Sequence, residues 1–227
     1  QYLIEPNEFF KKEMSLDEDK QNINEYYVFP GVEKGGKQKE DEIKEISEFL
    51  SLITSKKHTV LEGTDSSGKT ALLKQIYLSL IGNYVPIYLN VDSIINRNPE
   101  KVLKNAFEIQ YGSKAIDFEK FQQIDKEKKI VLIDDLNKIN QRFIGALQGY
   151  LFENVGHIVS IVEPKIVINF YEQIKEKYQS EDIIRLRILP FYTTKRLELI
   201  RKNLACISHG EYSDIKQQAE NINNFIY

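Results

Sequence analysis

Apolar residues recur along this chain with two different periods, and the two patterns alternate. Five short runs rich in β-branched residues predict strands, at residues 58–62, 85–91, 130–135, 157–162 and 184–189. Between them, apolar residues at three- and four-residue steps predict helices, at about 40–53, 68–81, 98–107, 117–123, 141–152 and 193–204. Asn98 and Pro99 form a helix start, because the first can cap the helix and the second fits its first turn.

This alternation predicts the fold class. Strands that alternate with helices form a parallel sheet with helices on both faces, so we expect an α/β fold with three layers, αβα. Sheets of this kind bind ligands at the carboxyl ends of their strands. We divide the chain into a polar flank (1–39), an α/β core (40–205) and the start of a further helical segment (206–227).

The first predicted strand runs directly into a glycine-rich segment, Gly63-Thr64-Asp65-Ser66-Ser67-Gly68-Lys69-Thr70, which matches the pattern G-x-x-x-x-G-K-[ST] in full. Glycines let the backbone curl so that N–H groups face phosphate oxygens, and the following helix adds its positive end. We expect Lys69 to reach the β- and γ-phosphates as a catalytic residue, and the Thr70 hydroxyl to ligate magnesium. These eight residues and Ala71 are therefore the predicted site for ATP and Mg²⁺.

Two carboxylates end the third predicted strand, in the segment IVLIDD. A hydrophobic strand that ends in Asp is common, but this one follows a phosphate-binding loop at a plausible distance. We expect Asp134 to hold the magnesium ion through water, and Asp135 to polarise the attacking water as a catalytic residue. The alternative for Asp135 is a solvated carboxylate at a strand end.

Several other side chains have both a functional and a structural interpretation. Ser160 is either a γ-phosphate sensor or a core serine. Arg185 and Arg187 share one face of the fifth strand, where a structural ion pair is favoured over a phosphate contact. Pro190 is a candidate for the adenine pocket, and so is the aromatic flank segment 27–29.

Composition limits the classes of function. The 31 basic and 34 acidic residues give a net charge of −3, so no global positive field predicts nucleic-acid binding. A single cysteine excludes an internal disulfide and fits the reducing cytoplasm. No apolar run approaches the roughly 20 residues that a membrane span needs. Because the chain begins at Gln1 rather than Met, we expect a fragment or a processed form.

With both motifs in place, the chain resembles the STAND class of P-loop ATPases, the signal-transduction NTPases that include NACHT-type proteins and bacterial antiphage sensors. The similarity rests on GTDSSGKTALLKQI, IVLIDDL, VPIYLNV and a late strand that ends in ILPF before a helix. It implies a sheet ordered 5-1-4-3-2 in predicted-strand numbers. It also implies an ATP-switched homo-oligomer with effector and sensor domains outside this chain. The class often has an Arg at the end of the fourth strand, and residues 160–163 supply none.

Two other functions stay open. The pattern E-G-x-D-x-x-G-K at residues 62–69 also resembles thymidylate kinases, although 57 residues precede the predicted first strand at residue 58 and no Asp-Arg pair follows the third. An AAA-type ATPase that acts on DNA is the other alternative, against which the acidic balance counts. We therefore predict an ATP-binding, slowly hydrolysing P-loop NTPase domain. Its predicted role is a nucleotide-dependent signalling or oligomerisation switch, with antiphage defence as one setting.

Overall fold

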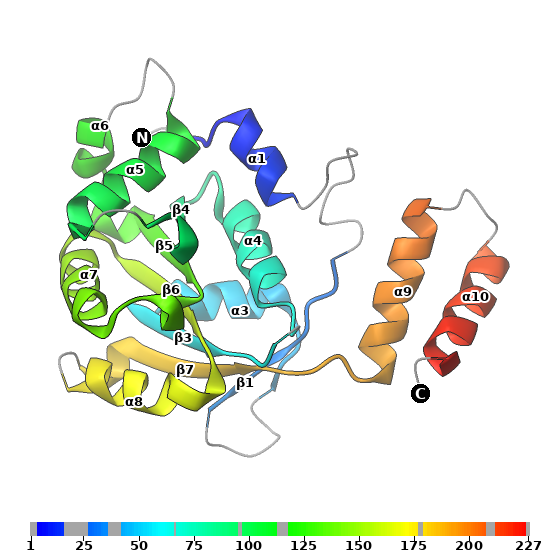
Figure 1. Cartoon of the computed structure of the whole chain (residues 1–227). Helices are drawn as coiled ribbons and strands as arrows, with labels where there is room; N and C mark the ends of the chain where they lie inside the picture. The colour runs from blue at the N-terminus through cyan, green and yellow to red at the C-terminus, as the bar shows by residue number, and fades with distance from the viewer. Residues whose placement is uncertain are drawn as a thin grey trace.

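The computed structural model describes residues 4–15, 27–35, 42–65, 67–94, 97–112, 118–176, 179–207 and 212–225. One seven-stranded sheet lies at its centre, in the order β2-β1-β7-β3-β6-β5-β4 (Figure 1). The strands are β1 (Val32–Lys34), β2 (Glu42–Ile43), β3 (His58–Glu62), β4 (Val85–Asn90), β5 (Lys129–Asp134), β6 (His157–Val162) and β7 (Ile183–Ile188).

The helices are α1 (Glu8–Met14), α3 (Ile46–Ile53), α4 (Lys69–Leu80), α5 (Pro99–Tyr111), α6 (Phe118–Gln123), α7 (Gln141–Asn154), α8 (Pro164–Lys175), α9 (Thr193–Ile207) and α10 (Tyr212–Phe225). The predicted start of α5 is confirmed, since the Asn98 side chain accepts a hydrogen bond from the Lys101 N–H (3.2 Å). Within the described ranges, no helix has the length and apolar character that crossing a membrane requires.

Five strands are parallel, and their order, β7-β3-β6-β5-β4, is the predicted order 5-1-4-3-2. The sheet differs in detail from the prediction at the β7 edge, where β1 pairs antiparallel with β7 and β2 pairs antiparallel with β1. These strands have three and two residues, which is too short for an apolar period to be recognised.

Two apolar cores fill the space between the sheet and its helices, which confirms the three-layer αβα class. One core joins the sheet to α5, α6, α7 and α8, and the other joins the opposite face to α1, α3 and α4. Alternate residues of each strand face opposite sides, so Val131 and Ile133 belong to the first core and Ile130 and Leu132 to the second. The sheet is thus buried on both faces, as parallel sheets are.

Two helices depart from the sequence-based expectations. Helix α1 lies in the segment assigned to the flank, yet Phe10 and Met14 are buried in the second core, and the Phe10 ring meets the Tyr77 ring at 5.5 Å. Helix α8 was not predicted. It begins with Pro164 directly after β6 and packs a short apolar stripe, Val167, Phe170 and Ile174, against the sheet.

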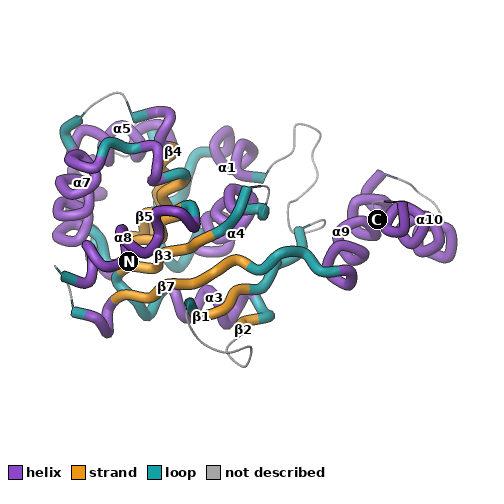
Figure 2. Tube along the Cα trace, turned by 60° about the horizontal axis from the view of Figure 1, so that its bottom comes forward, coloured by secondary structure: helices purple, strands orange, loops and turns teal. Residues whose placement is uncertain are grey.

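Helices α9 and α10 form a hairpin beside the α/β body (Figure 2). The Arg196 Nε donates to the Asn223 side-chain oxygen across the hairpin (2.7 Å). The hairpin is joined to the flank by two lysines of α9, because Lys195 donates to the Phe29 carbonyl (2.7 Å) and Lys202 to the Tyr27 carbonyl (2.8 Å). These two hydrogen bonds hold flank residues 27 and 29 against α9.

Candidate functional site

The glycine-rich loop leaves the sheet at the end of β3 and enters α4. The Ser67 N–H donates to the Thr64 carbonyl (3.2 Å), which curls the loop. A Cβ at Gly63 would lie 2.6 Å from the Ser67 Oγ and 3.0 Å from the Lys69 Cγ, so a side chain there would displace the Ser67 hydroxyl and crowd Lys69. Gly68 caps α4 with a φ of 79°, a left-handed conformation that glycine adopts without strain. Ser66 lies outside the described residues.

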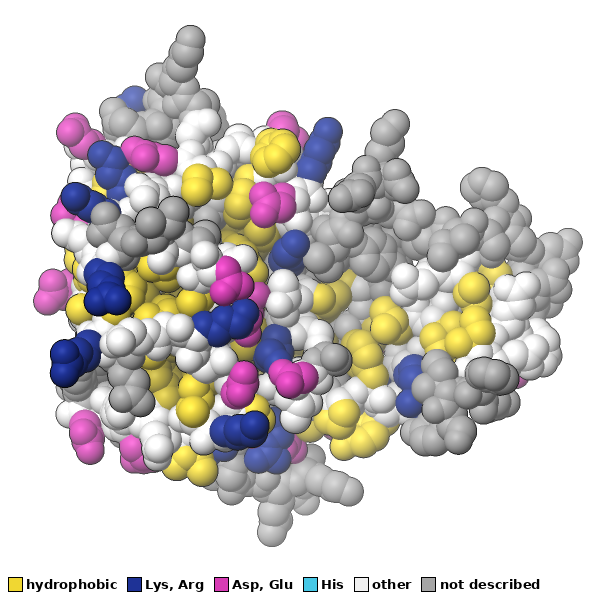
Figure 3. Space-filling model, viewed as in Figure 1, with side chains coloured by type: hydrophobic (Ala, Val, Ile, Leu, Met, Phe, Trp, Pro, Cys, Tyr) yellow, Lys and Arg dark blue, Asp and Glu magenta, His cyan; other side chains and the backbone are white. Residues whose placement is uncertain are grey.

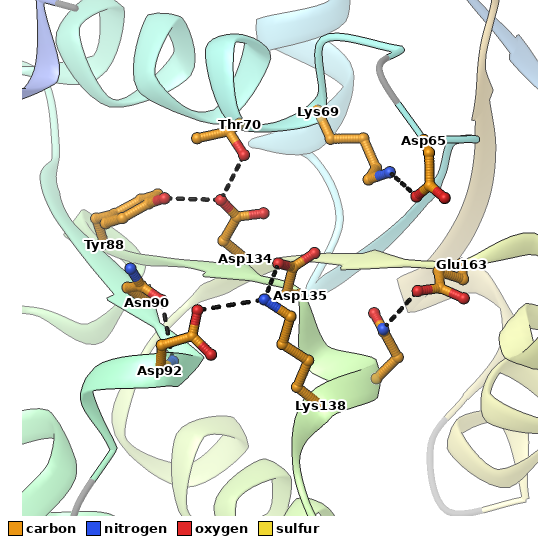
Figure 4. Close-up of polar contacts among 11 residues, drawn as sticks. Asp65, Lys69, Thr70, Tyr88, Asn90, Asp92, Asp134, Asp135, Lys138 and Glu163 are labelled. Atoms are coloured by element: carbon orange, nitrogen blue, oxygen red, sulfur yellow. Dashed lines mark hydrogen bonds and ion pairs between the residues drawn. The ribbon is translucent and has the colours of Figure 1, made fainter.

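The Lys69 ammonium folds back against the loop that precedes it. It donates to the Thr64 carbonyl (2.8 Å) and lies 3.7 Å from the Asp65 carboxylate, the ion pair drawn in Figure 4. The Lys69 side chain is 12% exposed, so its positive charge is held at the loop rather than in solvent. Ala71 continues the first turn of α4 and is partly buried. Backbone N–H groups at a helix start and one lysine together suit an anion.

The two sequence motifs meet at one carboxylate oxygen. The Thr70 hydroxyl, from α4, donates to the Asp134 Oδ2 at the end of β5 (2.8 Å). The Tyr88 hydroxyl, from β4, donates to the same oxygen (2.7 Å), and Figure 4 shows the three side chains converging. Burial raises the pKa of the Tyr88 hydroxyl and the Asp134 charge adds to it, so this hydroxyl stays protonated and acts as the donor.

The same side chains fit a divalent cation of the magnesium type. Asp134 is 6% exposed, and its Oδ1 is buried with no hydrogen-bond partner among the described residues. A buried carboxylate oxygen without a donor is costly in a protein interior unless a cation or water meets it. Magnesium is held by one or two protein oxygens together with phosphates and water, so Thr70 and Asp134 suffice. No cluster of three His, Cys, Asp or Glu that could hold a metal by itself occurs within the described ranges.

Asp135 has a different environment from its neighbour Asp134. It is partly exposed and has a positive φ of 53°, an uncommon conformation for a residue other than glycine. Its carboxylate pairs with the Lys138 ammonium (2.8 Å), which also contacts the Asp92 carboxylate (3.2 Å). These two hydrogen bonds raise the pKa of Lys138, so it stays charged at neutral pH. The short 3-10 turn Leu136–Lys138 brings the lysine back to Asp135.

Charged side chains of both signs gather in the middle of the face seen in Figure 3. At the end of β6, Glu163 accepts a hydrogen bond from the Asn137 amide (2.9 Å).

Ser160 lies deeper in the same strand, β6, and is fully buried. Its hydroxyl lies 2.9 Å from the His58 Nε2. This placement agrees with the core-serine interpretation of Ser160 and not with a γ-phosphate sensor.

The two arginines of β7 form the structural ion pair that the sequence favoured. Glu62, the last residue of β3, is 3% exposed and accepts hydrogen bonds from both Arg185 (2.9 Å from Nε) and Arg187. Arg187 also pairs with Glu33 of β1 (3.1 Å). These hydrogen bonds hold the end of β3 against β7. They therefore fix the start of the glycine-rich loop, because Gly63 follows Glu62 directly.

A cavity of about 310 Å³ lies between the flank, α3 and α9. Its walls include Tyr27, Phe29, Ile46, Lys195 and Lys202, so the aromatic flank segment faces an open space. The Tyr27 hydroxyl is buried and has no hydrogen-bond partner among the described residues, and burial raises its pKa. Pro190, the other predicted adenine contact, is exposed and does not line this cavity.

Sequence reasoning missed Tyr88 and Lys138. The segment VPIYLNV was recognised as a strand, but the reach of one tyrosine to Asp134 depends on β4 being the neighbour of β5. Lys138 follows Asp135 by three residues, and a 3-10 turn with a positive φ at its start cannot be read from residue types. A polar residue in an otherwise apolar strand beside the aspartate strand is the signal that points to Tyr88.

Comparisons with known proteins give structural similarities alone. No family model matches the chain, and no curated protein matches it. Among solved structures, the RuvB Holliday junction branch migration motor of Thermotoga maritima is similar with 13% identity and a TM-score of 0.48 over 77% of this chain. Domain III of the replication initiation protein DnaA of Thermotoga maritima is similar with 20% identity and a TM-score of 0.49, over 78% of this chain and 73% of that one. This chain spans 54% of the RuvB chain that it matches.

Proposed function

We propose that this chain binds ATP with magnesium at the loop between β3 and α4. The contact that carries the proposal is the 2.8 Å hydrogen bond between Thr70 and Asp134, because it joins two motifs that are 64 residues apart at one point. Lys69 and the N–H groups at the start of α4 supply positive charge for the phosphates. Thr70 and Asp134 supply the oxygens for magnesium, which neutralises phosphate charge when bound.

The adenine base belongs in the cavity beside the flank. Its volume of about 310 Å³ is at the lower end for ligand pockets, which suits a single purine ring system. Tyr27, Phe29 and Ile46 provide apolar surface along the walls of this cavity. A contact of the base with Pro190 remains a prediction from the sequence.

Slow hydrolysis is the second part of the proposal. Water would attack the γ-phosphorus while the bond to the bridging oxygen breaks, and ADP would leave with the electron pair of that bond. Asp135 would accept the hydrogen bond that orients the water, and the proton that the water loses would pass to solvent. Asp135 is paired with Lys138 in this structure, and the pair is partly exposed. A carboxylate held by an ammonium is a weaker acceptor for water, which supports slow turnover of the isolated chain.

The third part is a switch. The base cavity is shared by the flank and by α9, which the two lysine–carbonyl hydrogen bonds hold together. A bound base would therefore touch both the α/β body and the hairpin, and a ligand that prefers one arrangement of them shifts their equilibrium. With the resemblance to STAND proteins, this supports an ATP-dependent signalling or oligomerisation domain, with defence against phage as one setting and its effector and sensor domains elsewhere.

The test compares turnover and molecular mass of the chain and of Asp135→Asn, with Asp182→Asn as control. Asp182 carries the same charge but pairs with Lys57 at the amino end of the sheet. We expect Asp135→Asn to hydrolyse ATP at least ~100-fold more slowly while ATP still binds, and light scattering to show a mass that differs between ATP and ADP. Phosphoryl transfer to thymidine monophosphate would instead support a kinase, and DNA-stimulated turnover a DNA-acting ATPase.

A further inference from the structure

Strand β4 carries a tyrosine two residues before the position that pairs with Asp134, the proposed metal ligand of its neighbour β5. The two strands are parallel, with Tyr88 opposite Leu132 and Asn90 opposite Asp134. Leu132 and Asp134 are two residues apart, so both face α4, and the Tyr88 ring lies in the core on that same face. Tyr88 is 9% exposed, and its hydroxyl shares the Asp134 Oδ2 with the Thr70 hydroxyl.

The backbone of Tyr88 is held by a side chain. Strand β4 is an edge strand, and edge strands leave N–H and C=O groups without a strand partner. The Gln110 amide, from α5, satisfies both groups of Tyr88, since its oxygen accepts from the N–H (2.9 Å) and its nitrogen donates to the carbonyl (2.7 Å). Gln110 is 2% exposed. The tyrosine is thus fixed at its backbone, along its ring and at its hydroxyl.

This rigid hydroxyl controls which oxygen of Asp134 is available. Thr70 and Tyr88 both donate to Oδ2, whereas Oδ1 has no partner among the described residues. Two donors on Oδ2 fix the rotation of the Asp134 carboxylate, so the position of Oδ1 is fixed as well. Groups that orient a metal ligand in this way affect metal affinity strongly even though they do not touch the metal.

We propose that Tyr88 is a positioning residue that holds Asp134 for the magnesium ion of MgATP. The inference rests on the proposed function, since it concerns the metal of the same site. It assigns Tyr88 no contact with nucleotide. Loss of the hydroxyl should therefore weaken ATP binding in the presence of magnesium and leave magnesium-free ATP binding unchanged.

The experiment measures ATP affinity by calorimetry with Mg²⁺ and with EDTA, for the wild-type chain, Tyr88→Phe and Tyr111→Phe. Tyr111 is the matched control, because its buried hydroxyl donates to the Pro86 carbonyl (2.8 Å) on the same strand, away from Asp134. The measured quantity is the ratio of the ATP affinity in Mg²⁺ to that in EDTA. We expect this ratio to be lower by ~10-fold or more in Tyr88→Phe than in the wild type, and to be unchanged in Tyr111→Phe. Thermal unfolding of each variant checks that the fold is retained.

Three outcomes would overturn the inference, and a fourth would overturn the proposed function. An unchanged magnesium gain in Tyr88→Phe would mean that the hydroxyl does not position Asp134. Equal losses in both variants, or a loss in EDTA as large as that in Mg²⁺, would mean a structural role for Tyr88. Absence of ATP binding by the wild-type chain under both conditions would overturn the proposed function itself, so the two failures are distinguishable.

Discussion

Protonation of His58 should make the fold less stable as the pH falls below 7. His58 begins the central strand β3 and is fully buried, with its ring against Phe152 and Phe170 at 5.7 and 6.1 Å. Its Nε2 meets the Ser160 hydroxyl. No carboxylate pairs with this imidazole in the part of the chain that the structure describes, and burial lowers the pKa of His58 to about 3.

The sign and size of the effect follow from proton binding. Between pH 3 and 6.5 the unfolded chain binds a proton at His58 and the folded chain does not, so stability rises with pH in this window. The unfolding free energy has its full value above the pKa of His58 in the unfolded chain, and it decreases as the pH falls through that pKa. With a pKa of about 6.5 in the unfolded chain, the loss between pH 7 and pH 5 is about 2 kcal/mol.

The assay is urea unfolding at pH 7 and pH 5, for the wild-type chain, His58→Leu and Phe107→Leu. His58→Leu removes the titrating group, and we expect the drop in unfolding free energy between the two pH values to be smaller by about 2 kcal/mol than in the wild type. Phe107→Leu is a destabilised control at a buried ring of α5 that packs on Phe118 and Phe121, so it should keep the wild-type pH dependence. Equal pH dependence in His58→Leu and the wild type would refute the reasoning.

Two further substitutions test the ion pairs of Glu62, directly before the glycine-rich loop, and the close packing inside that loop. Glu62→Gln leaves the two arginines of β7 without their buried carboxylate and should lower the unfolding free energy by about 3 kcal/mol, whereas a loss below ~1 kcal/mol in urea unfolding would mean that the pair is solvated. Gly63→Ala puts a methyl group 2.6 Å from the Ser67 Oγ and should weaken ATP binding ~10-fold in calorimetry. Gly149→Ala, at a helical position with open space around it, is its control, and equal affinities in the two variants would contradict a tight loop.

The parts of the fold that sequence reasoning predicted are those where one local pattern decides the structure. Buried parallel strands such as β5 are continuous apolar runs, and the glycine loop must follow β3 and precede a helix. Together these features also fix which strand ends lie near the loop. The proximity of Thr70 and Asp134 could therefore be predicted from the sequence. In the structure, the Thr70 Oγ1 lies 2.8 Å from the Asp134 Oδ2.

The parts that were missed depend on contacts between segments distant in sequence. Strand β1 exists because β7 offers it an edge, and α1 is ordered by burying Phe10 and Met14 against α4. Tyr88 is a polar residue in an apolar strand, but its contact with Asp134 can be predicted only once β5 is known to be the neighbouring strand. Lys138 is an exposed lysine with no distinctive sequence motif around it. Its ion pair with Asp135 depends on the positive φ of Asp135, which residue types do not predict.

The most direct test of the central claim is a calorimetric titration of the chain with ATP and magnesium, compared with Lys69→Ala and Lys104→Ala. Lys104 is a half-exposed lysine of α5, so its removal changes the net charge equally without touching the loop. We predict that the wild type and Lys104→Ala bind ATP alike and that Lys69→Ala binds at least ~10-fold more weakly. No binding by the wild type, or equal binding by Lys69→Ala, would contradict the assignment of this loop as the nucleotide site.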